Sequence, residues 1–326
     1  MIYTLTLNPS LDYTVRLDSL RPGELNRTAA EDLHPGGKGI NVSRMLAHLG
    51  YESCAWGFIA GFTGEEIARG LTLEGIRTDF IRTAGVSRIN VKVKADKETE
   101  INGSGPVITD DDKDKLLKKL DGLGHGDWLV LSGSVARGLP GDWYAGILKR
   151  LSGRGIRFVV DAEGTPLRTA LAGRPFLVKP NGSELSALLE KPVRTKRQAA
   201  EGAVCLRELG ARNVLVSLGG DGAVLAAADG GVYGCDAPKG QVVDTVGSGD
   251  SMVAGFLSGW LENGGDSRAA LRMAVAAGSA SAFSPGLATK KEVERVLERT
   301  EVPGKAGKAE TDEKVRTAGA PHAPRP

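Results

Sequence analysis

The sequence has few of the residues that build disulfide frameworks, zinc sites and nucleophile triads. Its three cysteines, Cys54, Cys205 and Cys235, are far apart in the 326-residue chain and form no CxxC pair. An odd number of scattered cysteines argues against a disulfide framework or a zinc site and is typical of buried thiols in a reducing compartment. The four histidines are also scattered, and none lies in a nucleophile signature.

Long apolar runs and an excess of one charge are absent as well. No segment approaches ~20 consecutive apolar residues, and the first residues lack a basic leader before an apolar run, so we expect a cytoplasmic protein with no membrane span. Forty-two basic and forty acidic residues leave a formal net charge of +2. This balance predicts no nucleic-acid partner, and small anionic substrates would need only local charge.

What the sequence does contain is enough apolar material for one large or two modest domains, since 41% of its residues are hydrophobic. Short apolar strands alternate with amphipathic helices from residue 2 to about 300, which predicts an α/β fold. Residues 303–326 differ in composition, because they contain no leucine, isoleucine, methionine or aromatic residue. We expect this tail to be disordered.

A strand of period two at residues 88–94 interrupts the alternation of strands and helices. Its apolar residues alternate with polar ones, and a turn at 95–97 leads into a second short strand at 98–103. A hairpin with one polar face does not belong in the middle of a sheet covered on both faces. With the alternating residues that follow the first strand, it predicts a small β-layer, from about 10–34 and 86–104, that serves as a lid or a dimer surface. For most of its lysines and arginines we expect a solvated strand face.

The stretch from Val243 to Leu261 carries the strongest functional signal. A β-branched run leads into Gly247-Ser248-Gly249-Asp250 and then into small and apolar residues, which predicts a strand, a tight turn and a buried helix. Free backbone N–H groups at such a helix start, with no side chain at Gly247 or Gly249, form a pocket for an oxyanion or a phosphate. Asp250 beside this pocket is either the base that deprotonates an attacking hydroxyl or a simple helix cap.

Two earlier stretches also place polar groups where ligands bind. Gly36, Gly37 and Gly39 surround Lys38 at a predicted helix start, so that backbone and ammonium can approach a phosphate, although the spacing is not that of a Walker A loop. Asp12 follows the end of the first strand, where parallel α/β sheets hold ligand groups. The alternative for Asp12 is an exposed turn aspartate.

Asn181 and Glu184, three residues apart at a predicted helix start, share one side of the first turn. Their oxygen atoms fit a hydrated Mg²⁺, and the alternative is a helix cap followed by an acidic residue. The glycine-rich strand end at 217–223 fits a nucleotide phosphate site, but by itself it is only a turn signal.

Taken in order, these motifs resemble those of the ribokinase-like (PfkB-type) carbohydrate kinases over residues 1–300. Residues 36–44, Gly-Gly-Lys-Gly-Ile-Asn-Val-Ser-Arg, resemble the N-terminal sugar signature of that family, and residues 244–251, Asp-Thr-Val-Gly-Ser-Gly-Asp-Ser, resemble its C-terminal signature. The resemblance implies a ribokinase-like three-layer αβα sandwich with a small β-sheet lid. It also implies ATP-dependent phosphorylation of a sugar, Mg²⁺ as cofactor, and a homodimer formed through the lid.

Within the family, a lysine after the paired glycines resembles the branch that acts on phosphorylated sugars. Residues 88–92 and 98–102 resemble most closely the kinases of fructose 1-phosphate, with the kinases of tagatose 6-phosphate and fructose 6-phosphate as neighbours. The resemblance therefore implies conversion of D-fructose 1-phosphate to fructose 1,6-bisphosphate. The rival hypothesis is a non-catalytic sensor of sugar phosphates or nucleotides.

The resemblance implies a role for each matching residue. The residues expected to bind the sugar phosphate are Asp12, Gly37, Lys38, Asn41, Arg88, Asn102 and Ser134, with Lys38 and Arg88 paired to its existing phosphate. The residues expected to line the ATP site are Lys179, Asn181, Ser217, Gly219 and Gly222, and Glu184 with Asn181 would organise Mg²⁺. Gly247, Ser248 and Gly249 would form the anion hole for the γ-phosphoryl group, and Asp250 would be the base.

The sequence departs from the family pattern at two places. Val135-Ala136-Arg137 stands where a proline-rich segment is expected, and Ser248 replaces the usual alanine between the glycines. We expect the serine to be harmless, because backbone amides bind the anion.

Overall fold

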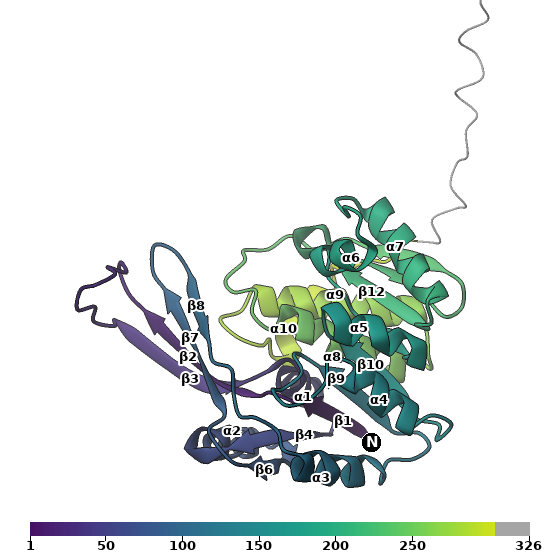
Figure 1. Cartoon of the computed structure of the whole chain (residues 1–326). Helices are drawn as coiled ribbons and strands as arrows, with labels where there is room; N and C mark the ends of the chain where they lie inside the picture. Colours follow the sequence, from purple (N-terminus) through teal and green to yellow (C-terminus); the bar gives the residue numbers. More distant parts are fainter. Residues whose placement is uncertain (304–326) are drawn as a thin grey trace, which may run out of the picture.

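One large sheet forms the centre of the molecule in the computed structural model, which describes residues 1–303 (Figure 1). Its strands are β1 (Ile2–Thr6), β4 (Ser53–Ala60), β5 (Arg77–Thr78), β6 (Ile81–Thr83), β9 (Trp128–Ser132), β10 (Arg157–Asp161), β11 (Leu177–Val178), β12 (Asn213–Ser217), β13 (Ala223–Ala226) and β14 (Val232–Cys235). Their order is β14-β13-β12-β11-β10-β9-β1-β4-β5, and β6 pairs with β4. All pairs are parallel except those of β13, which form an antiparallel edge that the sequence analysis did not predict.

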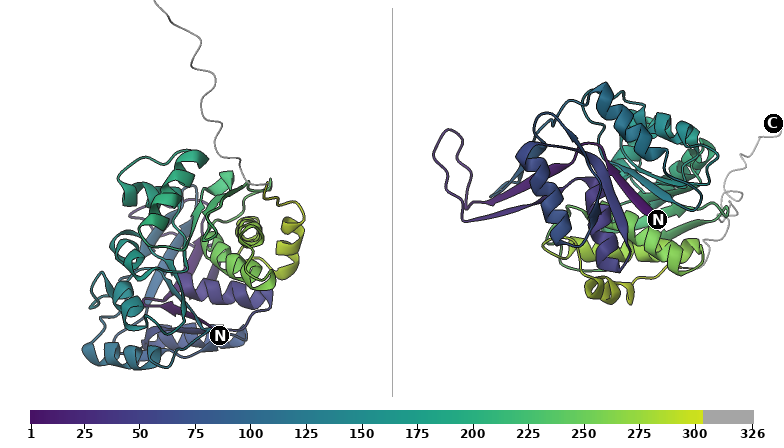
Figure 2. Two further views of the ribbon diagram at one scale, coloured as in Figure 1. Left: turned by 90° about the vertical axis from the view of Figure 1, so that its right-hand side faces the viewer. Right: turned by 90° about the horizontal axis from the view of Figure 1, so that it is seen from below.

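Helices cover both faces of this sheet, so the predicted three-layer sandwich is confirmed (Figure 2). One face packs against α1 (Lys38–Leu49), α2 (Gly61–Leu73), α8 (Ser248–Glu262), α9 (Ser267–Ala282) and α10 (Lys290–Leu297). The other face packs against α3 (Asp110–Leu120), α4 (Trp143–Arg150), α5 (Gly164–Ala170), α6 (Gly182–Leu189) and α7 (Lys196–Glu208). No helix within residues 1–303 is long and apolar enough to cross a membrane.

Helices α8 and α9 approach each other so closely that glycine is required between them. A Cβ atom at Gly255 would lie 2.6 Å from the Met273 carbonyl oxygen, and one at Gly259 would lie 2.8 Å from that of Ala269. The small residues of α8 and α9 therefore allow the two helices to pack closely, and dispersion contacts accumulate over the whole interface. This packing holds α8, and with it the turn at its N-terminus, firmly in place.

A second sheet stands off the body, where the sequence predicted a small β-layer (Figure 1). We call it the lid sheet; it consists of β2 (Ser10–Arg16), β3 (Ala30–Gly36), β7 (Arg88–Lys94) and β8 (Thr99–Asn102), in the order β3-β2-β7-β8. Strands β2 and β7 pair in parallel, which requires them to come from separate parts of the chain. The two predicted lid segments therefore form one sheet.

The lid sheet buries its polar face and exposes much of its apolar face. Asn90 and Lys92 on β7 are each only 7% exposed, whereas Ile89 on the same strand is 38% exposed and Ile101 on β8 is 61% exposed. The expectation of a solvated strand face is therefore wrong for Lys92. The alternation of the sequence shows that two faces exist, but only the tertiary arrangement decides which face turns toward the body.

The prediction of a strand at residues 243–246 is wrong. Residues 241–245 run as a loop in which the Val243 N–H donates to the Ala282 carbonyl oxygen of α9, at 2.8 Å, instead of pairing with a strand. Val242 and Val243 are 60% and 55% exposed, because this loop is at the rim of a cavity rather than in a sheet. The helix predicted after the turn is confirmed as α8. Of the predicted disordered tail, residues 304–326 lie outside the described part of the chain.

Candidate active site

Polar residues meet at the carboxyl ends of the central strands. Thr6 of β1, Ser132 of β9 and Asp161 of β10 occupy one row of the strand register, and all three are buried. Helix α1 begins directly above β1, and a Cβ atom at Gly39 would lie 2.5 Å from the Thr6 Oγ1 atom, so that position requires glycine. In open α/β sheets this edge, next to the strand where the chain order changes direction, is the usual ligand site.

Two cavities open at this edge and share Gly247 in their walls. The larger cavity has a volume of about 680 Å³ and is lined by the turn before α8, the ends of β10, β11 and β12, and helix α9. The smaller cavity has a volume of about 230 Å³ and lies between the lid sheet, α1 and the loop before α8. The turn at the N-terminus of α8 therefore separates two neighbouring ligand spaces.

Asp250 lies at the junction of these cavities. It is 6% exposed, lines the larger cavity, and accepts a hydrogen bond at Oδ2 from the Asn41 Nδ2 atom at 2.8 Å. Asn41 in turn lines the smaller cavity. The helix begins after Gly247 with no side-chain cap, so the interpretation of Asp250 as a simple cap is wrong.

The pKa of Asp250 is raised to about 6, first by burial and then by the neighbouring carboxylate of Asp161. The hydrogen bond from Asn41 and the ammonium groups of Lys179 and Lys38 oppose this rise. The carboxyl is thus ionised at neutral pH but far more basic than an exposed aspartate, which is the property that a general base needs.

The turn before α8 presents backbone N–H groups to the cavities. Those of Gly247, Gly249 and Asp250 have no acceptor within residues 1–303, whereas the Ser248 N–H donates to the Thr245 carbonyl oxygen at 3.2 Å. The predicted anion hole is therefore supported by the geometry at Gly247 and Gly249 but not at Ser248. Gly247 has a φ of 77°, in the left-handed region that favours glycine.

Asp161 is a site residue that the sequence analysis missed. Its carboxylate is fully buried, with Oδ1 at 3.3 Å from the Lys38 Nζ atom and Oδ2 at 3.5 Å from the Lys179 Nζ atom. Oδ2 has no hydrogen-bond partner within residues 1–303. The available signal was an aspartate at the end of the apolar run Phe158–Asp161, since a charge there is costly to bury without a partner.

Lys38 and Arg88 do not converge on one site in the way that the sequence analysis expected. Lys38 lines the larger cavity, where its Nζ atom also lies 3.9 Å from the Glu184 Oε1 atom. Burial lowers the pKa of the Lys38 ammonium, but Asp161, Glu184 and Asp250 outweigh burial and hold that pKa above its ordinary value. Arg88 lines neither cavity, and its Nε atom donates to the Asn8 carbonyl oxygen at 3.0 Å.

Asn181 and Glu184 form a capping box at the start of α6. Asn181 Oδ1 accepts from the Glu184 N–H, and Glu184 Oε2 accepts from the Asn181 N–H, each at 2.8 Å. The cap interpretation is thus confirmed, and both residues also line the larger cavity. The Glu184 Oε1 atom forms neither of these two hydrogen bonds. The capping box therefore fixes the orientation of the Glu184 carboxylate and leaves Oε1 outside the cap.

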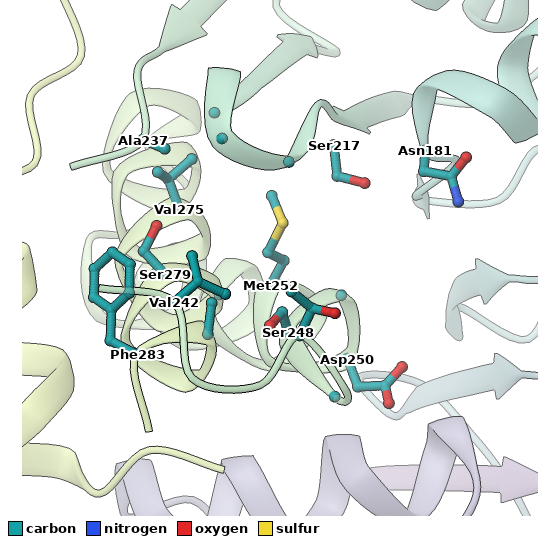
Figure 3. Close-up of a pocket in the computed structure, with 18 of the residues that line it drawn as sticks. Asn181, Ser217, Ala237, Val242, Ser248, Asp250, Met252, Val275, Ser279 and Phe283 are labelled. Carbon is teal, nitrogen blue, oxygen red and sulfur yellow. The ribbon is translucent and has the colours of Figure 1, made fainter. Parts of the chain in front are cut away.

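The rest of the larger cavity changes from polar to apolar along its length. Ser217, Gly219 and Gly222 line it as predicted, at the end of β12. Phe283 and Val242 lie at the end away from Asp250 (Figure 3). An elongated cavity with charged groups at one end and an apolar wall at the other fits a nucleotide with its phosphates toward α8.

Asp12 is the centre of a buried polar network on the lid sheet. It is 7% exposed, and its carboxylate accepts from Ser10 Oγ at 2.6 Å and Asn90 Nδ2 at 3.0 Å, with the Lys92 Nζ atom at 3.2 Å. The alternative of an exposed turn aspartate is therefore wrong. Lys92 lines the smaller cavity together with Asp12, and the sequence analysis had not selected it.

The remaining predicted sugar-site residues are not part of the wall of the smaller cavity. Gly37 precedes α1, Asn102 is the register partner of Asn90 and is exposed, and Ser134 is exposed after β9. None of the three lines either cavity. Their roles remain predictions.

Comparison with known proteins agrees with this arrangement. The model of the pfkB family of carbohydrate kinases matches residues 5–294. The chain is 43% identical over 302 residues to 1-phosphofructokinase of Bacillus subtilis, covering 93% of this chain and 99% of that protein. It is 38% identical over 306 residues to D-tagatose-1-phosphate kinase of Bacillus licheniformis, covering 93% of this chain and 99% of that protein.

Among solved structures, the chain is similar to phosphofructokinase-2 from Escherichia coli in complex with substrates and products. The TM-score is 0.86 at 30% identity, with 91% of this chain and 98% of that chain covered. Ribokinase of Arabidopsis thaliana, complexed with ribose and ATP, has a TM-score of 0.74 at 24% identity, with 91% and 98% covered, and shares the fold.

Proposed function

The chain belongs to the pfkB family of carbohydrate kinases, and from this premise we propose that it transfers the γ-phosphoryl group of ATP to D-fructose 1-phosphate. The product would be fructose 1,6-bisphosphate. ATP-dependent phosphorylation of a sugar phosphate is the activity of the family branch, and the choice of fructose 1-phosphate is our proposal. It rests on the relatives named 1-phosphofructokinase and on the site itself.

The observation that carries the proposal is the position of Asp250 between two cavities of unequal size. The larger cavity fits a nucleotide, and the smaller one, of about 230 Å³, fits a hexose phosphate beside Asp12 and Lys92. Gly247 belongs to both walls, and Asn41 of the smaller cavity is bonded to Asp250. A hydroxyl in the smaller cavity and a phosphoryl group in the larger one would thus meet at the turn before α8.

Each group at this junction has a task in phosphoryl transfer. Asp250 would accept the proton of the free primary hydroxyl as its oxygen attacks the γ-phosphorus, while Asn41 keeps the carboxylate oriented. The N–H groups of Gly247 and Gly249, which have no acceptor within residues 1–303, would stabilise the charge on the transferring group. Lys38 and Lys179 would neutralise the phosphates, with Asp161 holding both ammonium groups in place.

The residues present fit a hydrated Mg²⁺ at the phosphate end of the larger cavity. Within residues 1–303, Asp161 Oδ2 accepts no hydrogen bond and Glu184 Oε1 takes no part in the capping box. These two carboxylate oxygens, each also near a lysine ammonium, could therefore face the ion or its water ligands. No group of three His, Cys, Asp or Glu side chains within residues 1–303 could hold a metal unaided. Nucleotide phosphates and water would complete the shell, as is usual for Mg²⁺. When bound, the ion would neutralise phosphate charge.

The proposed function is tested by a coupled ATP assay across four sugar phosphates. We expect kcat/KM to be highest for fructose 1-phosphate, followed by tagatose 1-phosphate, and lowest for fructose 6-phosphate and tagatose 6-phosphate. Tagatose 1-phosphate is the second candidate, because the relatives include kinases named for it. A higher kcat/KM for tagatose 1-phosphate or for a 6-phosphate would refute the assignment, and ATP binding without any turnover would favour a sensor.

We also propose that two copies of the chain associate through the lid sheet. Its outward face exposes Leu33, Ile89 and Ile101 at 52%, 38% and 61%, while its inward face is polar and buried. An exposed apolar sheet face of this kind is typical of a surface that a partner covers. The solved phosphofructokinase-2 structures include one described as tetrameric, so association occurs in a relative.

Replacing Ile101 with aspartate is expected to shift the protein from dimer to monomer in sedimentation velocity experiments. A charge in the middle of an apolar interface has to be desolvated, which costs several kcal/mol. Val107→Asp is the matched control, since Val107 is 51% exposed but lies outside the lid sheet. A monomeric wild type at micromolar concentration would contradict the dimer proposal.

A further inference from the structure

An ion pair joins the lid sheet to the loop that precedes α8. The Lys94 Nζ atom, on the last residue of β7, lies 2.5 Å from the Asp244 Oδ2 atom. Their side chains are 22% and 19% exposed, so water screens the pair only partly. Both residues also line the smaller cavity. The contact therefore forms part of the wall where the lid meets the body.

On the body side, Asp244 is tied to the turn that carries the anion hole. Its Oδ1 atom accepts from the Val246 N–H at 2.9 Å, one residue before Gly247. The backbone N–H groups of Val243 and Asp244 both donate to the Ala282 carbonyl oxygen, at 2.8 and 3.3 Å. The carboxylate of Asp244 thus has a fixed place relative to α8 and α9.

On the lid side, Lys94 continues the row of polar residues that includes the sugar-site network. It lies two residues after Lys92, which contacts the Asp12 carboxylate, and side chains two apart on a strand share a face. Burial raises the pKa of the Asp244 carboxyl, but the bonds from Lys94 and Val246 outweigh burial and hold that pKa below its ordinary value. The Asp244 carboxyl is therefore ionised at neutral pH.

We propose that Lys94 and Asp244 are positioning residues that lock the lid sheet onto the anion-hole loop, so that the acceptor site and the phosphoryl site assemble together. The inference rests on the proposed sugar-phosphate kinase activity. The pair aligns Asp12 and Lys92 with Gly247 and closes one end of the smaller cavity to water. Alignment of the acceptor and exclusion of water favour phosphoryl transfer to the sugar over phosphoryl transfer to water.

The kinetic test uses Lys94→Met and Asp244→Asn, which remove one charge each. Asparagine keeps an acceptor for the Val246 N–H, so that the loop remains bonded. For each variant we expect the KM for fructose 1-phosphate to rise about tenfold, with little change in the KM for ATP and with more ATP hydrolysed per sugar phosphorylated. Lys97→Met is the matched control, since Lys97 is exposed in the turn of the same hairpin.

A charge exchange distinguishes a specific pair from two separate effects. The double variant Lys94→Glu with Asp244→Lys restores the attraction with the charges reversed. We expect its KM for fructose 1-phosphate, and the amount of ATP hydrolysed per sugar phosphorylated, to return part of the way to the wild-type values. The proposal would be overturned if the two substitutions had additive effects in the double variant. It would also be overturned if the single variants had the wild-type KM for fructose 1-phosphate and hydrolysed no more ATP per sugar phosphorylated than the wild type.

Hydrogen–deuterium exchange without any ligand provides a readout that does not depend on turnover. The amides of residues 95–101 are expected to exchange faster in Lys94→Met and Asp244→Asn than in wild type, and Lys97→Met is expected to match wild type. If the wild type phosphorylates no sugar phosphate, the proposed function fails while this measurement still decides whether the pair holds the lid. Unchanged exchange in both variants would overturn the locking role.

Discussion

Replacing Asp250 with alanine is expected to lower kcat for fructose 1-phosphate by a factor of about 10² to 10⁴, the usual contribution of a general base. The carboxylate is buried at the junction of the two cavities and accepts a hydrogen bond from Asn41, so its removal takes away the group placed to receive the proton. ATP binding, measured by calorimetry, is expected to persist because the larger cavity is otherwise unchanged. Asp221→Ala, which removes an exposed carboxylate from the strand end nearby, is expected to keep normal turnover.

The same assignment predicts how turnover depends on pH. Because Asp250 accepts a proton only as a carboxylate and its pKa is raised to about 6, kcat/KM is expected to fall as the pH decreases through about 6. Near-normal turnover in Asp250→Ala, or a profile that is flat between pH 5 and pH 8, would remove Asp250 from the role of base.

Loss of activity in this variant is not expected to come from unfolding. A carboxyl whose pKa is raised on folding stabilises the fold in acid, below its unfolded pKa near 3.8, and loses that contribution as the pH rises through about 6. At pH 8 the buried carboxylate therefore costs stability, and its removal is expected to leave the melting temperature equal or higher. Thermal unfolding of both proteins at pH 8 checks this point.

Replacing Lys38 with methionine is expected to lower kcat by about 10² to 10³ and to change the KM for fructose 1-phosphate much less. The ammonium lies in the larger cavity beside Asp161 and Glu184, where the γ-phosphoryl group would pass, so its charge is needed most in the transition state. Lys38→Arg retains the positive charge and is expected to recover part of kcat. Steady-state kinetics with both substrates varied separates the two parameters.

The opposite result would restore the role that the family resemblance first implied. If Lys38 anchors the phosphate already present on the sugar, Lys38→Met should raise the KM for fructose 1-phosphate strongly and leave kcat nearly unchanged. Lys92→Met provides the comparison, since Lys92 lies beside Asp12 in the smaller cavity. We expect that variant to bind the sugar phosphate poorly.

Much of the fold could be predicted because the local pattern of apolar, polar and glycine residues indicates where strands and helices lie. Apolar runs separated by glycine and polar turns determine where β9, β10 and β12 lie, and the alternation at residues 88–94 identified a strand outside the main sheet. Residues 243–246 were mistaken for a strand because β-branched residues in a loop at the rim of a cavity have the same pattern as those in a sheet. The edge strands β13 and β14 were not predicted.

The sequence by itself determined most of the order of strands and helices, the glycine turn before Asp250, and the polar residues available at the strand ends, since these depend on neighbours along the chain. Only the tertiary structure decided that Lys38 joins Lys179 around Asp161, that Asn41 holds Asp250, and that the polar face of the lid sheet turns inward. These contacts join residues far apart in sequence. Their charges and hydrogen bonds matter only after folding has removed water from around them.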